Sequence, residues 1–136
     1  MIFPETIPFL DLIGAELQRF AADKAEITCI SNDRLCNSFG NTHGGVLMTL
    51  LDVAMLFAAR SPAMPGEPPR ARVVTLDMQT AFLRSAEGEL RACGSVLHRS
   101  GTLAFCDALI WNDQDQVVAR ATGVFKTILA SSKAVT

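Results

Sequence analysis

The sequence contains the stretch His43-Gly44-Gly45-Val-Leu-Met-Thr-Leu-Leu-Asp52-Val-Ala-Met-Leu-Phe-Ala-Ala-Arg60, in which strong helix formers follow two glycines. Ser61-Pro62 ends the predicted helix. Its residues are apolar on nearly every side, which is typical of a helix surrounded by protein. It does not predict a membrane span, because residues 46–59 number only 14 and include Asp52, whereas a span needs roughly 20 apolar residues. We therefore predict a buried central helix.

Alternating apolar and polar residues predict β-strands on both sides of this helix. Before it, residues 15–31 read as one strand that could bend in its middle. After it, strands are predicted at residues 74–82, 89–98, 102–111 and 117–129. The short turns between the last strands are typical of an antiparallel meander, so we predict four strands in a row.

Together these elements predict an α+β fold, with an antiparallel sheet of five to six strands wrapped around one long central helix. A column of small residues, Ala119, Ala121 and Gly123, would let the helix come close to the last strand. A short helix near residues 6–12 and an exposed, proline-rich loop at residues 61–69 complete the layout. One domain is expected over residues 1–130, with a disordered tail at residues 131–136.

The composition excludes several classes of function. The formal net charge is -2 and the arginines are scattered, so no basic surface for nucleic acid is predicted. Apolar residues make up 49% of the chain and charged residues only 19%, which favours self-association into a homodimer and a homotetramer. The N-terminus carries no export pattern, so we expect a cytoplasmic protein.

The cysteines and histidines do not form a recognisable metal site. Four cysteines lie far apart, without a Cys-x-x-Cys pair, and are expected to be reduced structural residues. Only two histidines occur, and neither His43 nor His98 belongs to a zinc-binding pattern. We predict no metal and no redox cofactor, and we expect His98 to be an ordinary surface residue.

Asp52 is the residue that a function has to explain, because carboxylates are seldom buried among apolar residues unless they are paired or reactive. It could be a structural bracket that accepts hydrogen bonds, or a desolvated base or nucleophile with a raised pKa. Gly44 and Gly45 stand where the first N–H groups of the helix lack partners and could bind an oxyanion. They could also serve only a tight turn and close packing.

At these residues the sequence resembles the PaaI-like acyl-CoA thioesterases of the hotdog-fold superfamily. The resemblance rests on His43-Gly44-Gly45, six residues and then Asp52, followed by an apolar helix, a meander and a last strand reading Ala-Thr-Gly-Val-Phe. It covers roughly residues 35–128 and implies a hotdog fold.

The resemblance also implies roles for individual residues. Asp52 would act as general base or nucleophile, and the Gly44 N–H, with Gly45 adjacent, would polarise the thioester carbonyl. Asn37 matches an Asn often found six residues before the His, and Thr75 is the expected holder of the attacking water. His43 would orient Asn37 or the carbonyl, or cap the turn.

Hydrolysis of an acyl-CoA to a free acid and CoA is the leading hypothesis, with CoA entering as part of the substrate. A hotdog hydratase or dehydratase and a non-catalytic acyl-CoA-binding module are the alternatives. The acyl group, the choice between direct attack by Asp52 and attack by water, and the contacts of the CoA nucleotide with Arg72, Arg84 or Arg99 stay open.

Helix geometry gives one further expectation. Gly44 and Asp52 are separated by roughly 12 Å along one helix, too far to meet the same thioester. Two helices antiparallel across a two-fold axis would bring Asp52 and Thr75 of one chain to Asn37, His43 and Gly44 of the other.

Overall fold

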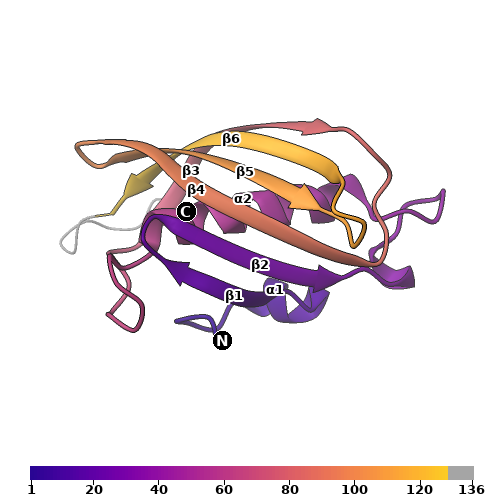
Figure 1. The fold of residues 1–136 in the computed structure, drawn as a ribbon, viewed down its shortest axis with the longest axis horizontal. Helices are drawn as coiled ribbons and strands as arrows, with labels where there is room; N and C mark the ends of the chain where they lie inside the picture. The colour runs from indigo at the N-terminus through magenta and orange to yellow at the C-terminus, as the bar shows by residue number, and fades with distance from the viewer. Residues whose placement is uncertain (129–136) are drawn as a thin grey trace.

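The computed structural model describes residues 1–128, and the tail predicted at residues 131–136 lies outside them. The chain forms one long helix, two short helical segments and six strands (Figure 1). In chain order they are α1 (Pro8–Ile13), β1 (Glu16–Ala21), β2 (Lys24–Ile30), η1 (Asp33–Leu35), α2 (Gly44–Arg60), β3 (Val73–Phe82), β4 (Glu89–Ser100), β5 (Leu103–Trp111) and β6 (Val117–Thr127).

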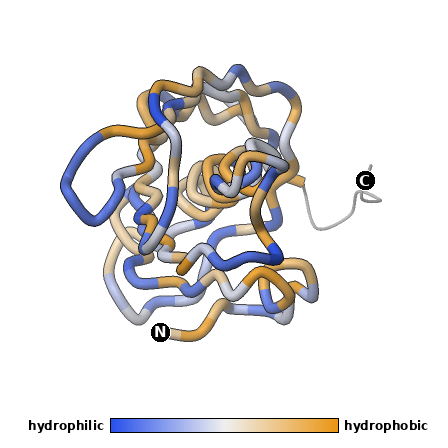
Figure 2. Tube along the Cα trace, turned by 90° about the vertical axis from the view of Figure 1, so that its right-hand side faces the viewer, coloured by the Kyte–Doolittle hydropathy of each residue, from blue (hydrophilic) through white to orange (hydrophobic). Residues whose placement is uncertain are grey.

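All six strands belong to one antiparallel sheet in the order β1-β2-β4-β5-β6-β3. The sheet curves around α2, which Figure 2 shows end-on near the centre of the molecule. The predicted α+β architecture, a sheet wrapped around one long helix, is therefore confirmed. None of the helices within residues 1–128 has the length and apolar character needed to cross a membrane.

The single strand predicted at residues 15–31 is wrong, because this segment forms a hairpin of β1 and β2. Ala22 and Asp23 make the turn, with φ of 55° and 63°. Two consecutive residues with positive φ match the twist of a two-residue hairpin, and Asn-Gly or Asp-Gly is the usual sequence there. Ala-Asp carries no glycine, so no residue pattern marks a turn at this point.

The predicted four-stranded meander is also wrong in one strand. β4, β5 and β6 follow one another as expected, but β3 pairs with β6 and not with β4. The Leu83 and Arg84 N–H groups both donate to Val118 O, which holds the end of β3 beside the start of β6. β3 is consequently an edge strand, and Leu76 and Phe82 on it are 54% and 52% exposed.

Helix and sheet approach each other closely at Gly94 of β4. A Cβ atom on Gly94 would lie 2.2 Å from Ala54 O of α2, so no side chain fits there. The small-residue column Ala119, Ala121 and Gly123 does face inward and is buried. At Gly123 a Cβ atom would meet the Met55 side chain of α2 at 3.3 Å, whereas at Gly94 it would meet the helix backbone itself.

The central helix is less completely covered than predicted. Its last four residues, 57–60, are buried, whereas Gly45, Met48, Asp52 and Leu56 form a stripe that is exposed or half-buried. Met48, an apolar residue, is 39% exposed on this stripe. The stripe repeats every three to four residues, so it lies along one side of α2.

The other end of α2 is held by arginines. Arg99 donates to Ala59 O at 3.0 Å and to Asp23 Oδ1 at 2.8 Å, and Arg70 Nε donates to Ser61 O. Lys and Arg side chains near a helix C-terminus bond its last carbonyls and favour its dipole. Arg99 is therefore a structural residue here. The four cysteines are unpaired, and Cys29 and Cys106 are buried.

Candidate active site

Asp52 and Thr75 are in direct contact between α2 and β3. Thr75 Oγ1 donates a hydrogen bond of 2.6 Å to Asp52 Oδ1. No hydrogen-bond donor to Asp52 Oδ2 is found among residues 1–128, so one carboxylate oxygen is fixed and the other is available. Both interpretations of Asp52 remain compatible with one fixed oxygen, and the second oxygen can accept a further hydrogen bond.

The surroundings of Asp52 raise its pKa. Burial raises the pKa of this carboxyl above its ordinary value, and the Thr75 hydrogen bond lowers it in part. Desolvation disfavours the charged form, while a hydrogen bond to the carboxylate favours it. Asp52 is half-buried on the stripe of α2 rather than fully buried, so a ligand can reach it.

His43 caps the N-terminus of α2. Its Nδ1 accepts the Gly45 N–H at 2.8 Å, and its backbone is extended, as an N-cap requires. Nδ1 is the acceptor in this bond, which leaves Nε2 as the ring nitrogen that can donate to another group. A Cβ atom on Gly45 would lie 3.0 Å from His43 Nδ1, so the second glycine makes room for the ring.

This cap separates the two predicted N–H donors. The Gly45 N–H is occupied by His43 and is not free to meet a ligand while the cap stands. No acceptor for the Gly44 N–H is found in the described part of the chain. Gly44 is thus the donor that this helix end offers, together with the positive end of the helix dipole.

Asn37 lies in the loop that leads to this helix end. Its Oδ1 accepts the Phe39 N–H at 2.9 Å and the Asn41 N–H at 3.2 Å, which fixes the side chain. The Nδ2 group is left to donate. Asn37 and Gly44 line one cavity of about 410 Å³ with Phe82 and Arg84, which we call the Arg84 cavity. Two hydrogen-bond donors thus line the same space.

The predicted residues form two separate groups within one protomer. Asn37 and Gly44 belong to the Arg84 cavity, whereas neither Asp52 nor Thr75 lines it. Eight residues of helix separate Gly44 from Asp52, roughly 12 Å along the axis. One protomer by itself therefore does not bring all the predicted groups to one thioester.

Phe82 is a site residue that the sequence analysis missed. Strict alternation from Thr75 would place Phe82 on the opposite face of β3, but the register shifts between Thr75 and Asp77. Because of this irregularity, Phe82 lies on the inner face of the sheet, the same face as Thr75. Phe82 pairs with Ala119 of β6, and Thr75 pairs with Phe125 of β6. A Cβ atom on Gly44 would lie 3.4 Å from the Phe82 ring. A bulge without glycine leaves no clear sequence signal.

The described residues contain no group of three His, Cys, Asp or Glu side chains that could hold a metal ion. His98 is exposed, with its ring centroid 6.1 Å from that of Phe105, on the outer side of the sheet. It lies on β4, apart from both groups of predicted residues, as expected of a surface histidine.

Comparison with known proteins places the chain in a family. The sequence model of the thioesterase superfamily matches residues 39–119, which include the helix N-terminus, Asp52 and Thr75. The chain belongs to the thioesterase superfamily. The hotdog fold and the resemblance to PaaI-like members, both inferred from the sequence, are confirmed.

Relatives of this thioesterase-superfamily chain include proteins of Halobacterium salinarum and Escherichia coli. Protein VNG_1336C of Halobacterium salinarum is named provisionally as an esterase. It is 30% identical to this chain over 118 residues, which cover 85% of this chain and 77% of the relative. The medium/long-chain acyl-CoA thioesterase YigI of Escherichia coli is 24% identical, covering 91% of this chain and 88% of YigI.

A solved structure of the Escherichia coli PaaI protein, from the phenylacetic acid degradation operon, superimposes with a TM-score of 0.80 at 23% identity. The superposition covers 89% of this chain and 84% of PaaI. At this level of identity the likeness shows that the two proteins share a fold.

Proposed function

We propose that this protein hydrolyses acyl-CoA thioesters to a free carboxylic acid and CoA, without a metal or a redox cofactor. The observation that carries the proposal is the Asp52–Thr75 pair, in which a carboxylate of raised pKa has one oxygen fixed and one free. A carboxylate that is to act as a base or nucleophile needs this combination of orientation and available lone pairs.

The N-terminus of α2 would provide the hydrogen-bond donors that stabilise the thioester oxygen. The Gly44 N–H and the Asn37 amide would donate hydrogen bonds to the thioester oxygen as negative charge develops on it. The cap formed by His43 holds the first turn in place, so we assign His43 a positioning role. Gly45 contributes by accommodating the His43 ring.

Two routes use the same residues. In one, Asp52 accepts a proton from a water molecule that the Thr75 hydroxyl helps to hold, and the hydroxide formed attacks the thioester carbon. In the other, Asp52 attacks directly and forms an anhydride, which water then hydrolyses. In both, the C–S bond breaks and the thiolate of CoA leaves and takes up a proton.

A homodimer would complete the site. In such a dimer Asp52 of one protomer would face Gly44 of an antiparallel partner helix. The two-fold axis would then lie beside α2 at Met48, the residue midway between Gly44 and Asp52. Met48 is the exposed apolar residue of the stripe on α2. The unpaired edge of β3, ten residues long, lies on the same side and would pair with its own copy. We predict this dimer and its assembly into a homotetramer.

A cross-link tests this assembly. Two cysteines can form a disulfide only when their Cα atoms are within about 7 Å. We expect Met48→Cys to form a covalent dimer under mild oxidation, whereas Met64→Cys, in the exposed loop after α2, remains monomeric on a denaturing gel. Equal cross-linking of the two variants would contradict the antiparallel arrangement.

The relatives support the acyl-CoA part of the proposal. YigI is named as a medium/long-chain acyl-CoA thioesterase, and the present chain spans most of its length. A panel of acyl-CoAs with a thiol reagent tests the activity directly. Release of free CoA that disappears in Asp52→Asn supports the proposal. Binding of acyl-CoA without thiol release would indicate a binding module, and hydration of an enoyl-CoA without thiol release would indicate a hydratase.

A further inference from the structure

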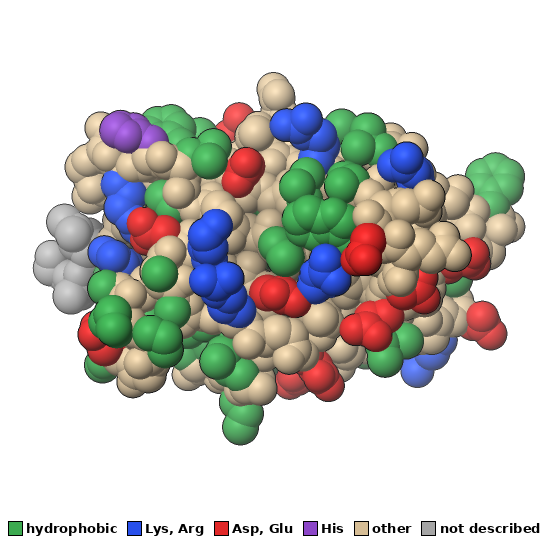
Figure 3. Space-filling model, viewed as in Figure 1, with side chains coloured by type: hydrophobic (Ala, Val, Ile, Leu, Met, Phe, Trp, Pro, Cys, Tyr) green, Lys and Arg blue, Asp and Glu red, His purple; other side chains and the backbone are tan. Residues whose placement is uncertain are grey.

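Phe39 lies at the tip of the loop of residues 36–42, which leads into α2. Its side chain is 87% exposed, more than that of any other phenylalanine in residues 1–128. Large aromatic side chains are mostly buried, because each removes a wide apolar area from water. The loop projects beyond the N-terminal end of α2 (Figure 1), and Figure 3 shows hydrophobic surface standing out at this same end of the molecule. Phe39 therefore presents apolar surface that the described part of its own protomer leaves uncovered.

Hydrogen bonds fix the shape of this loop. The Asn37 N–H donates to Asn41 O at 2.7 Å, and the Gly40 N–H donates to Asn37 O at 3.1 Å. The Asn37 side chain accepts the Phe39 N–H at 2.9 Å. Gly40 has φ of 82°, a conformation that glycine adopts without strain. Phe39 is thus held in a defined place by Asn37, one of the predicted site residues, and its exposure is not that of a frayed loop.

The Asp52–Thr75 pair has apolar neighbours that are also left uncovered. Leu56 lies one helical turn after Asp52 on the same side of α2 and is half-buried. Met48 lies one turn before Asp52 and is 39% exposed. The carboxylate is therefore part of an apolar stripe that is open to solvent on one side of the protomer.

The proposed antiparallel dimer would bring the loop tip and this stripe together. With the two-fold axis at Met48, Gly44 of one protomer faces the partner's Asp52. The chain that precedes Gly44 then lies beside the next turn of the partner helix, which carries the partner's Leu56. Residues 36–42 are that preceding segment, and Phe39 is at their tip.

We propose that Phe39 of each protomer covers the partner's Asp52 and packs against the partner's Leu56. The proposal rests on the thioester hydrolysis and the dimer proposed above, and it adds a residue to the site. A ring placed there displaces water from the carboxylate, and loss of hydration disfavours the charged form. Asp52 becomes more basic as a result, which favours both proton removal from water and direct attack.

Phe39→Ala tests the effect on the reaction. We expect kcat/KM for thiol release to fall about tenfold or more, because the carboxylate is hydrated again. Phe39→Leu keeps an apolar side chain at the tip and should stay within a few-fold of wild type. Wild-type activity in Phe39→Ala would overturn the proposal.

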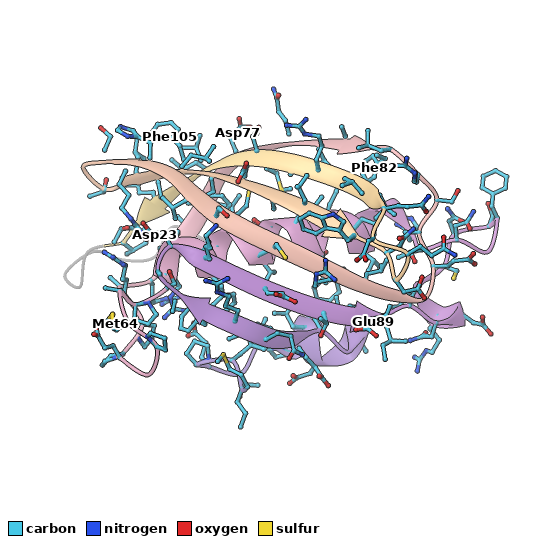
Figure 4. The ribbon with its side chains drawn as sticks, viewed as in Figure 1. Asp23, Met64, Asp77, Phe82, Glu89 and Phe105 are labelled. Atoms are coloured by element: carbon cyan, nitrogen blue, oxygen red, sulfur yellow. The ribbon has the colours of Figure 1, made fainter. Side chains whose placement is uncertain are left out.

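Phe105→Ala is the matched control, because it removes the same ring from another exposed position, on the outer side of the sheet. Figure 4 shows Phe105 at the opposite end of the molecule from Phe82, which lines the Arg84 cavity together with Phe39. We expect Phe105→Ala to keep the wild-type kcat/KM. Equal losses in Phe39→Ala and Phe105→Ala would contradict a specific role for Phe39.

A mixed dimer decides whether Phe39 acts on its own protomer or on the partner. Phe39→Ala and Asp52→Asn protomers are combined by subunit exchange, which mass spectrometry confirms. Across the interface, the intact Phe39 of the second protomer covers the intact Asp52 of the first, so the mixed dimer should reach about half the wild-type rate. That recovery would also show that the Phe39→Ala chain is folded. A mixed dimer with only half the rate of the Phe39→Ala dimer would place the effect within one chain and overturn the proposal.

Failure of the proposed hydrolysis would be distinguishable from failure of this inference. If no acyl-CoA releases thiol, hydrolysis is wrong, and the dissociation constant of the dimer, measured by analytical ultracentrifugation, tests the contact alone. Burial of the ring against the partner predicts that Phe39→Ala raises this constant about tenfold or more and that Phe105→Ala leaves it unchanged. The same constant in wild type and Phe39→Ala, or equal increases in the two variants, would contradict the contact.

Discussion

Thr75 Oγ1 donates to Asp52 Oδ1 across 2.6 Å, joining the middle of the central helix to the edge strand of the sheet. This one bond both orients the carboxylate and limits how far burial raises its pKa. It links two residues 23 positions apart in the chain, and only the curvature of the sheet around α2 brings them together.

Asp52→Asn should abolish most of the activity. The amide keeps the shape of the side chain but loses its basicity, so we expect turnover to fall by roughly two to four orders of magnitude, the usual effect of losing a general base. Thiol release measured at saturating substrate checks this. Turnover of the variant at the wild-type rate would rule out a catalytic role for Asp52.

The same substitution should not cost stability. The pKa of Asp52 is raised in the folded state, so protonated Asp52 favours folding below the unfolded pKa, and this contribution is lost as pH rises through the folded pKa. At pH 7 Asp52→Asn should therefore have a Tm equal to or above that of wild type, with the difference shrinking as the solution is acidified. A clearly lower Tm at pH 7 would favour the structural-bracket interpretation.

Thr75→Ala should be milder than Asp52→Asn. The water can still be held by the carboxylate alone, so we expect a loss of about ten- to a hundredfold in kcat, in line with a hydrogen bond to a charged group. Thr75→Ser keeps the hydroxyl and should stay within a few-fold of wild type. If alanine and serine behave alike, the hydroxyl of Thr75 has no part in the reaction.

The pH profile reports the state of Asp52. A base works deprotonated, so kcat/KM should fall as pH decreases, with its acid limb above the ordinary Asp value of 3.8. Because the Thr75 hydrogen bond lowers the pKa, Thr75→Ala should move the limb to higher pH, and Thr75→Ser should not. A limb that moves to lower pH in Thr75→Ala would contradict this assignment.

Gly94→Ala should destabilise the fold strongly. Its new Cβ atom would clash with Ala54 O, and neither backbone can move without separating α2 from β4. We expect a loss of at least about 2 kcal/mol in the free energy of unfolding, as for overpacked cores, measured by urea titration. Gly40→Ala is the control, because nothing lies within 4 Å of its Cβ position and only its positive φ is strained. Equal losses in the two variants would contradict the close approach.

The elements of the fold that could be predicted are those whose type is determined by residues close together in the sequence. The apolar helix with one carboxylate, Asp52, predicted the central element of the fold, which is confirmed, and a candidate reactive group. The turn at Ala22-Asp23 was not predictable, because its positive φ values occur without glycine. The position of β3 was missed because strand pairing is decided by contacts distant in sequence, here with β6.

Within the site, residue identities were easier to predict than their hydrogen bonds. Spacing and resemblance proposed Asn37, Gly44, Asp52 and Thr75, and the structure brings Asp52 to Thr75 and Asn37 to the cavity of Gly44. The hydrogen bond from the Gly45 N–H to His43 Nδ1 was not predictable, because it depends on a side-chain torsion of His43 that no residue pattern encodes. Phe82 was missed because the irregularity in β3 changes which face the residue occupies.

Subunit complementation tests most directly the central claim, that one active site is built from two protomers. Asp52→Asn and Asn37→Ala are each expected to be inactive, and a mixed dimer would contain one doubly damaged site and one intact site. After subunit exchange, confirmed by mass spectrometry, activity should return to about half the wild-type rate per mixed dimer. Confirmed exchange without any return of activity would show that each site lies within a single chain and would contradict the account.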